Sequence, residues 1–185
     1  MKICITGGIG SGKSYVCKCL KKRGIEVYDC DTAAKRLIQT SNTIRQQLIK
    51  LIGSDVYIGN QINKGVITKF LLTNNENNEA INNIIHPEVI KDFELSGLEW
   101  MESAILFESG INKLVDYIII VTAPEEVRIQ RVMKRNNISR EQVLQWMQHQ
   151  WPQEKICQLA DYEIINDGIA DIDKQLDEIL NNIKV

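Results

Sequence analysis

Residues 1–16 read MKICITGGIGSGKSYV, a short apolar run followed by a cluster of glycines and then a lysine and a serine. The apolar run, residues 2–6, predicts a buried strand, and the periodicity of residues 13–23 predicts a helix. Between the two lies the pattern G-x-x-x-x-G-K-[ST]. The stretch therefore predicts a strand, a phosphate-binding loop (residues 7–14, the P-loop) and a helix, in that order.

The defining residues of this pattern are Gly7, Gly12, Lys13 and Ser14. Glycines let backbone N–H groups turn toward phosphate oxygens, and the N-terminus of the following helix adds unpaired amides and a positive dipole end. Lys13 is expected to reach the β- and γ-phosphates, and the Ser14 hydroxyl is expected to ligate Mg²⁺. A glycine-rich turn with a chance lysine and serine is the alternative, which the flanking strand and helix disfavour. The pattern predicts nucleotide binding without specifying the reaction.

The 185 residues, 44% hydrophobic and 25% charged, fit one well-packed domain. A formal net charge of −2 gives no general attraction for polyanions, so nucleic acid is not an expected partner. No apolar run approaches the roughly 18 residues of a membrane span, and no signal-peptide layout is present, which predicts a cytoplasmic protein. The five cysteines show no C-x-x-C spacing and are expected to be reduced and mostly buried.

Apolar runs bounded by turn residues alternate with helical periodicity along the chain. Strands are predicted at residues 2–6, 25–28, 98–106, 117–121 and 162–165. Helices are predicted at residues 13–23, 33–39, 44–52, 125–135, 139–150 and 172–183. This alternation predicts an α/β fold with a parallel sheet. Residues 33–94 contain no convincing strand and are expected to form a helical excursion.

The second predicted strand leads into two aspartates, Asp29 and Asp31. Parallel sheets place their functional groups at the carboxyl ends of the strands. A kinase needs a carboxylate within hydrogen-bond distance of the acceptor hydroxyl, and Asp31, just past the end of the strand, is expected to face the phosphate site. The alternative is that both aspartates are only turn and N-cap residues of the helix that follows, a role that either could fill. A switch GTPase is disfavoured, because the nearest approach to N-K-x-D, NKLVD at residues 112–116, has one residue too many.

Three arginines of the helix predicted at residues 125–135 fall within about 60° of one another on an ideal helix. They are Arg128, Arg131 and Arg135, and Arg140 follows after a short turn. Such a basic stripe on a helical hairpin is suited to close over the nucleotide and neutralise the transferred phosphoryl group. A solvated helix face is the alternative.

Read in order, GGIGSGKS, VYDCD, IIHPEV, SAILFESG, the segment from Arg131 to Arg135 and ADYEIINDG resemble the dephospho-coenzyme A kinase family over nearly the whole chain. The resemblance implies a P-loop NTPase-type three-layer α/β fold with a parallel five-stranded sheet, a helical substrate-binding sub-domain and a lid. It implies phosphorylation of the ribose 3′-hydroxyl of dephospho-CoA by ATP and Mg²⁺, the last step of coenzyme A synthesis. The single domain would comprise a core at about 1–31, 96–123 and 159–185, the sub-domain at about 32–95 and the lid at about 124–158.

The resemblance also implies roles for single residues. Asp31 would be the general base, with Asp29 beside it at the substrate, and Lys13 and Arg135 would share in catalysis. His86 and Glu108 would contact the substrate, and Ser14 the metal. Nucleotide binding is implied for Gly8, Gly10, Ser11, Gly12, Lys13, Ser14, Tyr15, Arg131, Arg135, Asn166 and Gly168.

Several of these positions also have purely structural readings. Pro87 is a good first residue for a helix with His86 as its cap, and Asn-Asp-Gly at residues 166–168 is a common turn. Glu102, late in the third predicted strand, is a candidate carboxylate contact for the metal. The sequence departs from the family at Tyr15, where threonine is usual.

Two further functions remain as alternatives. A nucleoside or nucleoside-monophosphate kinase would share the P-loop and the lid, and a regulatory nucleotide-binding module would lack transfer chemistry. Release of ADP with different acceptors separates these readings.

Overall fold

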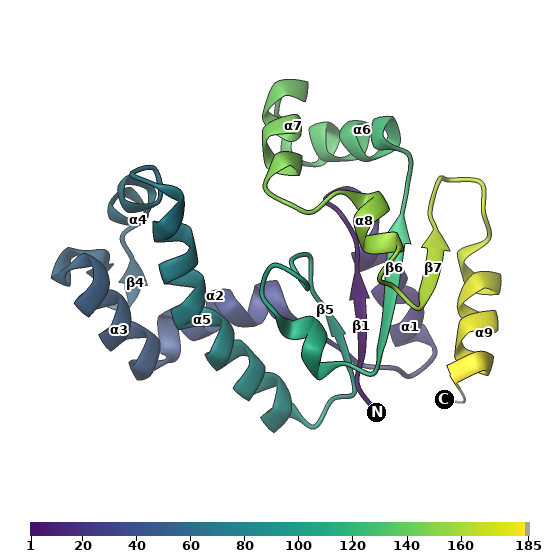
Figure 1. Ribbon diagram of the computed structural model, residues 1–185, viewed down its shortest axis with the longest axis horizontal. Coiled ribbons are helices and arrows are strands. Elements are labelled where there is room, and N and C mark those ends of the chain that lie inside the picture. The colour runs from purple at the N-terminus through teal and green to yellow at the C-terminus, as the bar shows by residue number, and fades with distance from the viewer. Residues whose placement is uncertain (184–185) are drawn as a thin grey trace. The chain divides into compact units, whose positions relative to one another are not determined.

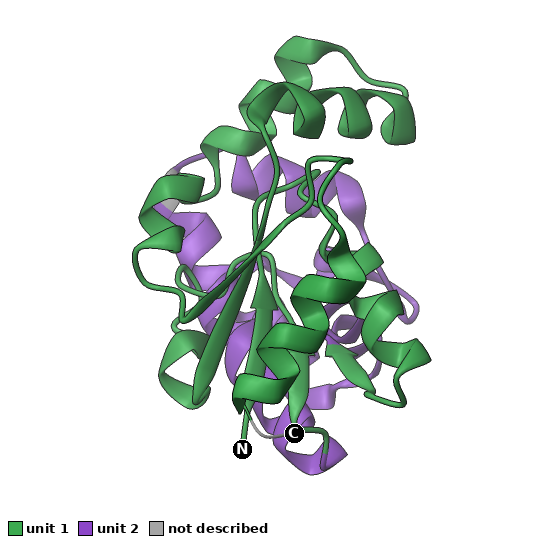
Figure 2. Cartoon of the chain, turned by 90° about the vertical axis from the view of Figure 1, so that its right-hand side faces the viewer, with its two compact units in different colours: residues 1–28, 98–185 green, residues 29–97 purple. Residues whose placement is uncertain are grey.

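The computed structural model describes residues 1–183, apart from the side chain of Asn75. The chain divides into two compact units, residues 1–28 with 98–185 and residues 29–97 (Figure 2). The first unit contains the P-loop, and the second contains the predicted helical excursion. Each unit is described by itself.

A five-stranded sheet has the strand order β2-β5-β1-β6-β7, so β1 lies at its centre (Figure 1). The strands are β1 (Ile3–Thr6), β2 (Val27–Asp29), β5 (Trp100–Glu102), β6 (Tyr117–Thr122) and β7 (Tyr162–Ile165). β1 pairs in parallel with β5 and β6, and β6 pairs in parallel with β7. The prediction of a parallel five-stranded α/β fold is confirmed, with β7 at the predicted bounds.

Five α-helices of the described residues belong to the first unit. They are α1 (Lys13–Lys22), α6 (Glu125–Asn136), α7 (Arg140–Gln148), α8 (Gln153–Cys157) and α9 (Ile172–Ile183). Ser139 and Gln142 form the predicted capping box at the start of α7. Figure 1 shows α9 running beside β7, while α6 and α7 form a hairpin beyond the ends of the strands.

The core of the first unit lies between the sheet and the pair α1 and α9. Its largest members on the strands include Ile5, Ile119 and Ile164, which are fully buried. Leu20 of α1 and Leu176 of α9 pack into the same cluster, also with no exposed surface. Apolar residues at three- and four-residue spacing therefore fix both helices on the sheet, and α1 fixes the C-terminal end of the P-loop.

The second unit is mostly helical. Its elements are α2 (Cys30–Thr40), α3 (Asn42–Ile52), a 3₁₀ turn (Ser54–Val56), β3 (Tyr57–Ile58), β4 (Gln61–Ile62), α4 (Lys64–Leu71) and α5 (Asn75–Ser96). α5 packs against α2 and α3. The Tyr57 hydroxyl donates a hydrogen bond to the Ile38 carbonyl, at 2.8 Å, which ties the short hairpin to α2.

The prediction that residues 33–94 contain no strand is wrong, because β3 and β4 form an antiparallel hairpin there. Each strand has only two residues, too few to produce an alternating pattern in the sequence. The third predicted strand is also shorter than expected, with β5 ending at Glu102. The apolar residues beyond it are held by local turns, and Leu106 is buried without pairing in the sheet.

The prediction that Pro87 begins a helix, with His86 as its cap, is wrong. Pro87 lies inside the 22-residue helix α5. Ile85 and Val89 are buried on either side of it along the chain, so the apolar contacts of the helix continue past the proline. We attribute the continuous helix to this burial, which offsets the backbone hydrogen bond that proline cannot donate.

No helix among the described residues is long and apolar enough to cross a membrane. None of the five cysteines forms a disulfide, and Cys4, Cys19 and Cys30 are buried. The prediction of mostly buried thiols outside disulfides is confirmed.

We expect Leu176→Ala to lower the free energy of unfolding by about 2–5 kcal/mol, because it removes a fully buried side chain between α9 and the sheet. Leu95→Ala is the matched control, since Leu95 also lies in a helix but is 79% exposed. Urea unfolding measures both. Equal losses in the two variants would contradict this assignment of the core.

Candidate active site

The P-loop turns sharply at the end of β1. Gly7 has a φ of 145° and lies so close to β6 that a Cβ atom there would be 2.3 Å from the Val121 carbonyl oxygen. The Lys13 ammonium group donates a hydrogen bond to the Gly7 carbonyl, at 2.8 Å, and so spans the loop. Gly12 is the N-cap residue of α1 and provides no side-chain hydrogen bond to it. The arrangement leaves the amides at the start of α1 without a capping side chain, as an anion site requires.

A cavity of about 150 Å³ opens beside this loop. Its lining comprises Gly10, Gly12, Lys13, Ser14, Arg131, Val132 and Arg135. The structure thus brings the predicted lysine and serine of the P-loop together with two of the predicted arginines of α6. Two or more cations around one small cavity favour a polyanionic ligand such as a triphosphate.

Arg131 is bound to the backbone of the loop it faces. Its Nη1 donates to the Asn166 carbonyl at 3.0 Å and to the Gly10 and Ser11 carbonyls at 3.4 Å each. The Asn166 side chain donates in turn to the Ser11 carbonyl, at 2.9 Å. Asn166 thereby joins the loop after β7 to the P-loop, and the predicted residues Arg131, Ser11 and Asn166 form one cluster.

The next residues after Asn166 form a turn. The Asp167 carboxylate accepts hydrogen bonds from the Ala170 and Ile169 N–H groups, and these bonds hold the pKa of Asp167 below its usual range. Gly168 has a φ of 95° and is exposed. Gly168 does not line the cavity, so its visible role is to permit this turn.

The predicted basic stripe on α6 is wrong for Arg128. This side chain is only 8% exposed, its Nε has no hydrogen-bond partner, and burial lowers its pKa. The reason is that α6 packs closely on the P-loop. Arg128 lies directly against both Gly8 and Gly10. The spacing of arginines along one helix does not predict this contact.

Arg135 is exposed and donates to the Asn136 side chain at 2.8 Å, while also lining the cavity. Arg140 pairs with Glu126, one bond measuring 2.7 Å. This pair raises the pKa of Arg140 and lowers that of Glu126. Arg140 therefore links α7 to α6 and is not part of the cavity lining.

The side chains of Ser14 and Glu102 bring two oxygen atoms close together, and both atoms could ligate a metal ion. Glu102 ends β5 in register with Ile5 of β1, and its Oε1 accepts a hydrogen bond from the Ser14 hydroxyl at 3.2 Å. A carboxylate and a hydroxyl at the edge of a phosphate site are the kind of ligand that Mg²⁺ prefers. The residues present therefore fit a magnesium ion.

Glu108 contacts the segment that follows α7. Its carboxylate accepts from the Trp151 N–H at 2.9 Å. The centres of the Trp151 and Phe107 rings lie 5.3 Å apart in a stacked pair, and the Lys155 ammonium lies 3.3 Å from the centre of the Trp151 ring.

Tyr15, the remaining predicted nucleotide contact, is 55% exposed and does not line the cavity.

Within the second unit, the carboxylates of Asp29 and Asp31 differ in their hydrogen bonds. Asp29 caps α2, accepting from the Thr32 N–H at 2.9 Å and from the Thr32 hydroxyl at 2.6 Å. Asp31 lies exposed in the first turn of the same helix, and its carboxylate forms no hydrogen bond or ion pair with the described residues. The capping role that both aspartates could have filled belongs to Asp29. The Asp31 carboxylate is available for another role.

His86 is half-buried within α5, and this burial lowers its pKa.

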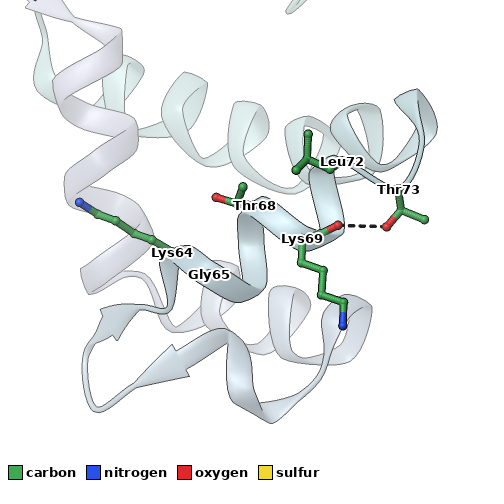
Figure 3. Close-up of a pocket in the computed structure, with 6 residues that line it drawn as sticks. All are labelled: Lys64, Gly65, Thr68, Lys69, Leu72 and Thr73. Atoms are coloured by element: carbon green, nitrogen blue, oxygen red, sulfur yellow. Dashed lines mark hydrogen bonds between the residues drawn. The ribbon is translucent and has the colours of Figure 1, made fainter.

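A separate surface pocket in the second unit is formed along α4 and the turn after it (Figure 3). Its lining comprises Lys64, Gly65, Thr68, Lys69, Leu72 and Thr73. Lys64 and Lys69 point in different directions, so their charges do not converge on one point. None of the predicted site residues lines this pocket.

Sequence reasoning missed Gln150. Its side chain bonds to Ile9 in the P-loop and to Ala104 after β5. No pattern in the sequence marks the residue, because both partners are backbone groups far from it along the chain.

Comparisons with known proteins agree with this geometry. The sequence model of the dephospho-CoA kinase (CoaE) family matches residues 1–171. The chain is 39% identical over 187 residues to the dephospho-CoA kinase of Bacteroides fragilis, covering 97% of this chain and 91% of that protein. It is 43% identical over 169 residues to the dephospho-CoA kinase of Porphyromonas gingivalis, covering 88% and 84%.

Solved structures share the fold. TT1252 from Thermus thermophilus superposes with a TM-score of 0.82 at 31% identity, over 100% of this chain and 96% of that one. A dephospho-CoA kinase from Campylobacter jejuni gives 0.66 at 20% identity, over 99% and 98%. Shikimate kinase from Aquifex aeolicus gives 0.54 at 18% identity, over 100% and 96%, so the fold is that of P-loop kinases. With the family model matching most of its length, this chain belongs to the dephospho-CoA kinase family.

Proposed function

We propose that this protein transfers the γ-phosphoryl group of ATP to the ribose 3′-hydroxyl of dephospho-CoA, giving coenzyme A and ADP. Membership of the family supports the reaction and the acceptor. The observation that carries the proposal is the cavity that joins Lys13 and Ser14 of the P-loop to Arg131 and Arg135 of α6. Phosphoryl transfer depends mainly on positioning and charge stabilisation, and this cavity supplies both.

On the donor side, Lys13 and the arginines would neutralise the phosphates. Arg131 has its direction fixed by three carbonyl groups, so little side-chain freedom remains to be lost when a nucleotide binds. Arg135, which is exposed at the rim, would approach the transferred group from the solvent side. Asn166 holds the Ser11 carbonyl, which supports the turn of the loop.

Ser14 and Glu102 would hold Mg²⁺. The bound ion would neutralise part of the charge on the phosphate oxygens. The Ser14 hydroxyl donates to Glu102, so the two oxygen atoms already lie 3.2 Å apart.

On the acceptor side, Asp31 would orient the ribose hydroxyl and accept its proton as the oxygen attacks the γ-phosphorus. Its support is that Asp29 performs the capping, which leaves the Asp31 carboxylate unengaged by the described residues. Asp29, His86 and Glu108 would contact the substrate. The unit of residues 29–97 would then supply the acceptor site, and the segment of residues 124–158 would act as the lid.

Five cysteines without a disulfide suit a reducing compartment, which supports a cytoplasmic enzyme. No nucleic acid or membrane partner is part of the proposal.

The experiment that tests the function is release of ADP from ATP with a panel of acceptors. We expect turnover with dephospho-CoA and none with AMP, CMP or nucleosides. Turnover with a nucleoside or nucleotide instead would establish the alternative kinase. Tight ATP binding with no stimulated ADP release would favour a binding module.

We expect Gly12→Ala to abolish measurable ATP binding. The new Cβ atom would lie 2.0 Å from the side-chain amide nitrogen of Asn166, and residue 12 has a φ of 98°, which favours glycine. Gly24→Ala is the matched control. Gly24 has a φ of 82° with nothing within 4 Å, so it should lose about 1–2 kcal/mol of stability from strain and keep its ATP affinity. Isothermal titration with ATP measures the difference. An intact ATP affinity in Gly12→Ala would argue against the P-loop site.

We expect Asp31→Asn to lower kcat by about 100-fold or more while the affinity for ADP stays within about twofold, because the amide cannot accept the proton. Asp55→Asn, an exposed aspartate of the same unit, should leave both unchanged. Steady-state kinetics and ADP titration provide the two readouts. Full turnover in Asp31→Asn would remove Asp31 from the role of base.

We expect Glu102→Gln to raise the Mg²⁺ concentration needed for half-maximal activity about tenfold, because the amide keeps the shape but loses the negative charge. Glu99→Gln is the control, since the Glu99 carboxylate contacts the N-terminal ammonium group at 3.3 Å. Magnesium titrations at fixed ATP compare the two. A shift of the same size in both variants would show that the effect is not local to Ser14.

A further inference from the structure

Gln150 uses both ends of its side-chain amide to join two loops. Its Oε1 accepts a hydrogen bond from the Ile9 N–H in the P-loop, at 2.8 Å. Its Nε2 donates to the Ala104 carbonyl, at 3.2 Å. Ala104 lies two residues after the end of β5. One half-buried side chain thus links the phosphate-binding loop to the loop that carries Glu108.

Ile9 is also held through its side chain. This side chain packs against a buried cluster of α6 and α7 formed by Ile129, Val132 and Val143. The backbone N–H of Ile9 donates to Gln150, one residue past the C-cap of α7. Both the side chain and the amide of this P-loop residue are therefore fixed by residues 124–158.

The backbone that carries Gln150 is itself anchored. The neighbouring Trp151 donates its N–H to Glu108 and stacks on Phe107 with the ring planes 9° apart. The Gln150 side chain consequently starts from a fixed point, and its bond to Ile9 restricts the loop more than a bond from a mobile residue would.

We propose that Gln150 is a positioning residue that holds the first turn of the P-loop in the conformation that binds the nucleotide phosphates. The inference rests on the proposed binding of ATP at the P-loop. Without the glutamine, the Ile9 N–H would be left without its partner in a partly buried place, and the turn would relax to pair it elsewhere. The backbone amides of the loop would then lose the preorganisation that phosphate binding needs.

The test compares Gln150→Met with Gln153→Met. Methionine keeps the length of the side chain and removes both hydrogen bonds. Gln153 is the matched control because its Oε1 also accepts from a backbone N–H, that of Ala123 at 3.3 Å, outside the P-loop. We expect Gln150→Met to raise the Kd for ADP and the KM for ATP about tenfold, the value of one such hydrogen bond. The KM for dephospho-CoA should stay within about twofold, and Gln153→Met should match the wild type.

A third variant, Gln150→Glu, keeps the acceptor for the Ile9 N–H and removes the donor to Ala104. We expect its affinity for ADP to lie between those of the wild type and Gln150→Met, which would assign the effect to the Ile9 bond. Wild-type affinity for ADP in Gln150→Met, whatever its melting temperature, would overturn the proposal. Titration with ADP needs no acceptor, so this result is independent of whether dephospho-CoA is the substrate. Failure of the wild type itself to bind ADP would instead contradict the proposed function.

Discussion

The close packing of backbone against backbone around the P-loop is the constraint on which the site depends. A side chain at Gly7 would meet the Val121 carbonyl oxygen, and one at Gly10 would meet the Arg128 carbonyl oxygen. The loop can turn only because both positions lack a Cβ atom. The buried faces of α1 and α9 pack on the sheet in which β1 pairs with β6, and this pairing places the turn where the loop after β7 can reach it.

The carbonyl groups of the P-loop explain the position of Arg131. The carbonyl groups of Gly10 and Ser11 accept hydrogen bonds from Arg131, and Ser11 also accepts from Asn166. In a peptide plane the N–H points opposite to the carbonyl, so binding the Ser11 carbonyl from one side leaves the Gly12 N–H directed to the other. Arg131 therefore helps to fix the conformation of the P-loop and also adds positive charge beside it.

The P-loop, the capping box of α7, the bounds of β7 and the parallel sheet were predictable because each depends on neighbours in the sequence or on periodicity. Arg128 was not, since its burial results from contact between α6 and Gly8, residues that are 120 positions apart. Pro87 misled the prediction because a local preference for helix starts is weaker than the burial of the apolar face around it. The hairpin of β3 and β4 was too short to leave a pattern.

By itself, the sequence determined the strand, P-loop and helix at the start of the chain, the lack of disulfides among its cysteines and the order of motifs that marks the family. The tertiary structure decided that Asp29 rather than Asp31 caps α2. It also decided that Arg131 and Arg135 share a cavity with Lys13, and that the Gln150 side chain accepts a hydrogen bond from the P-loop. The physical reason is range. Glycine conformation and helical periodicity act between near neighbours, whereas a side-chain hydrogen bond to a distant backbone group exists only after the sheet has brought the two segments together.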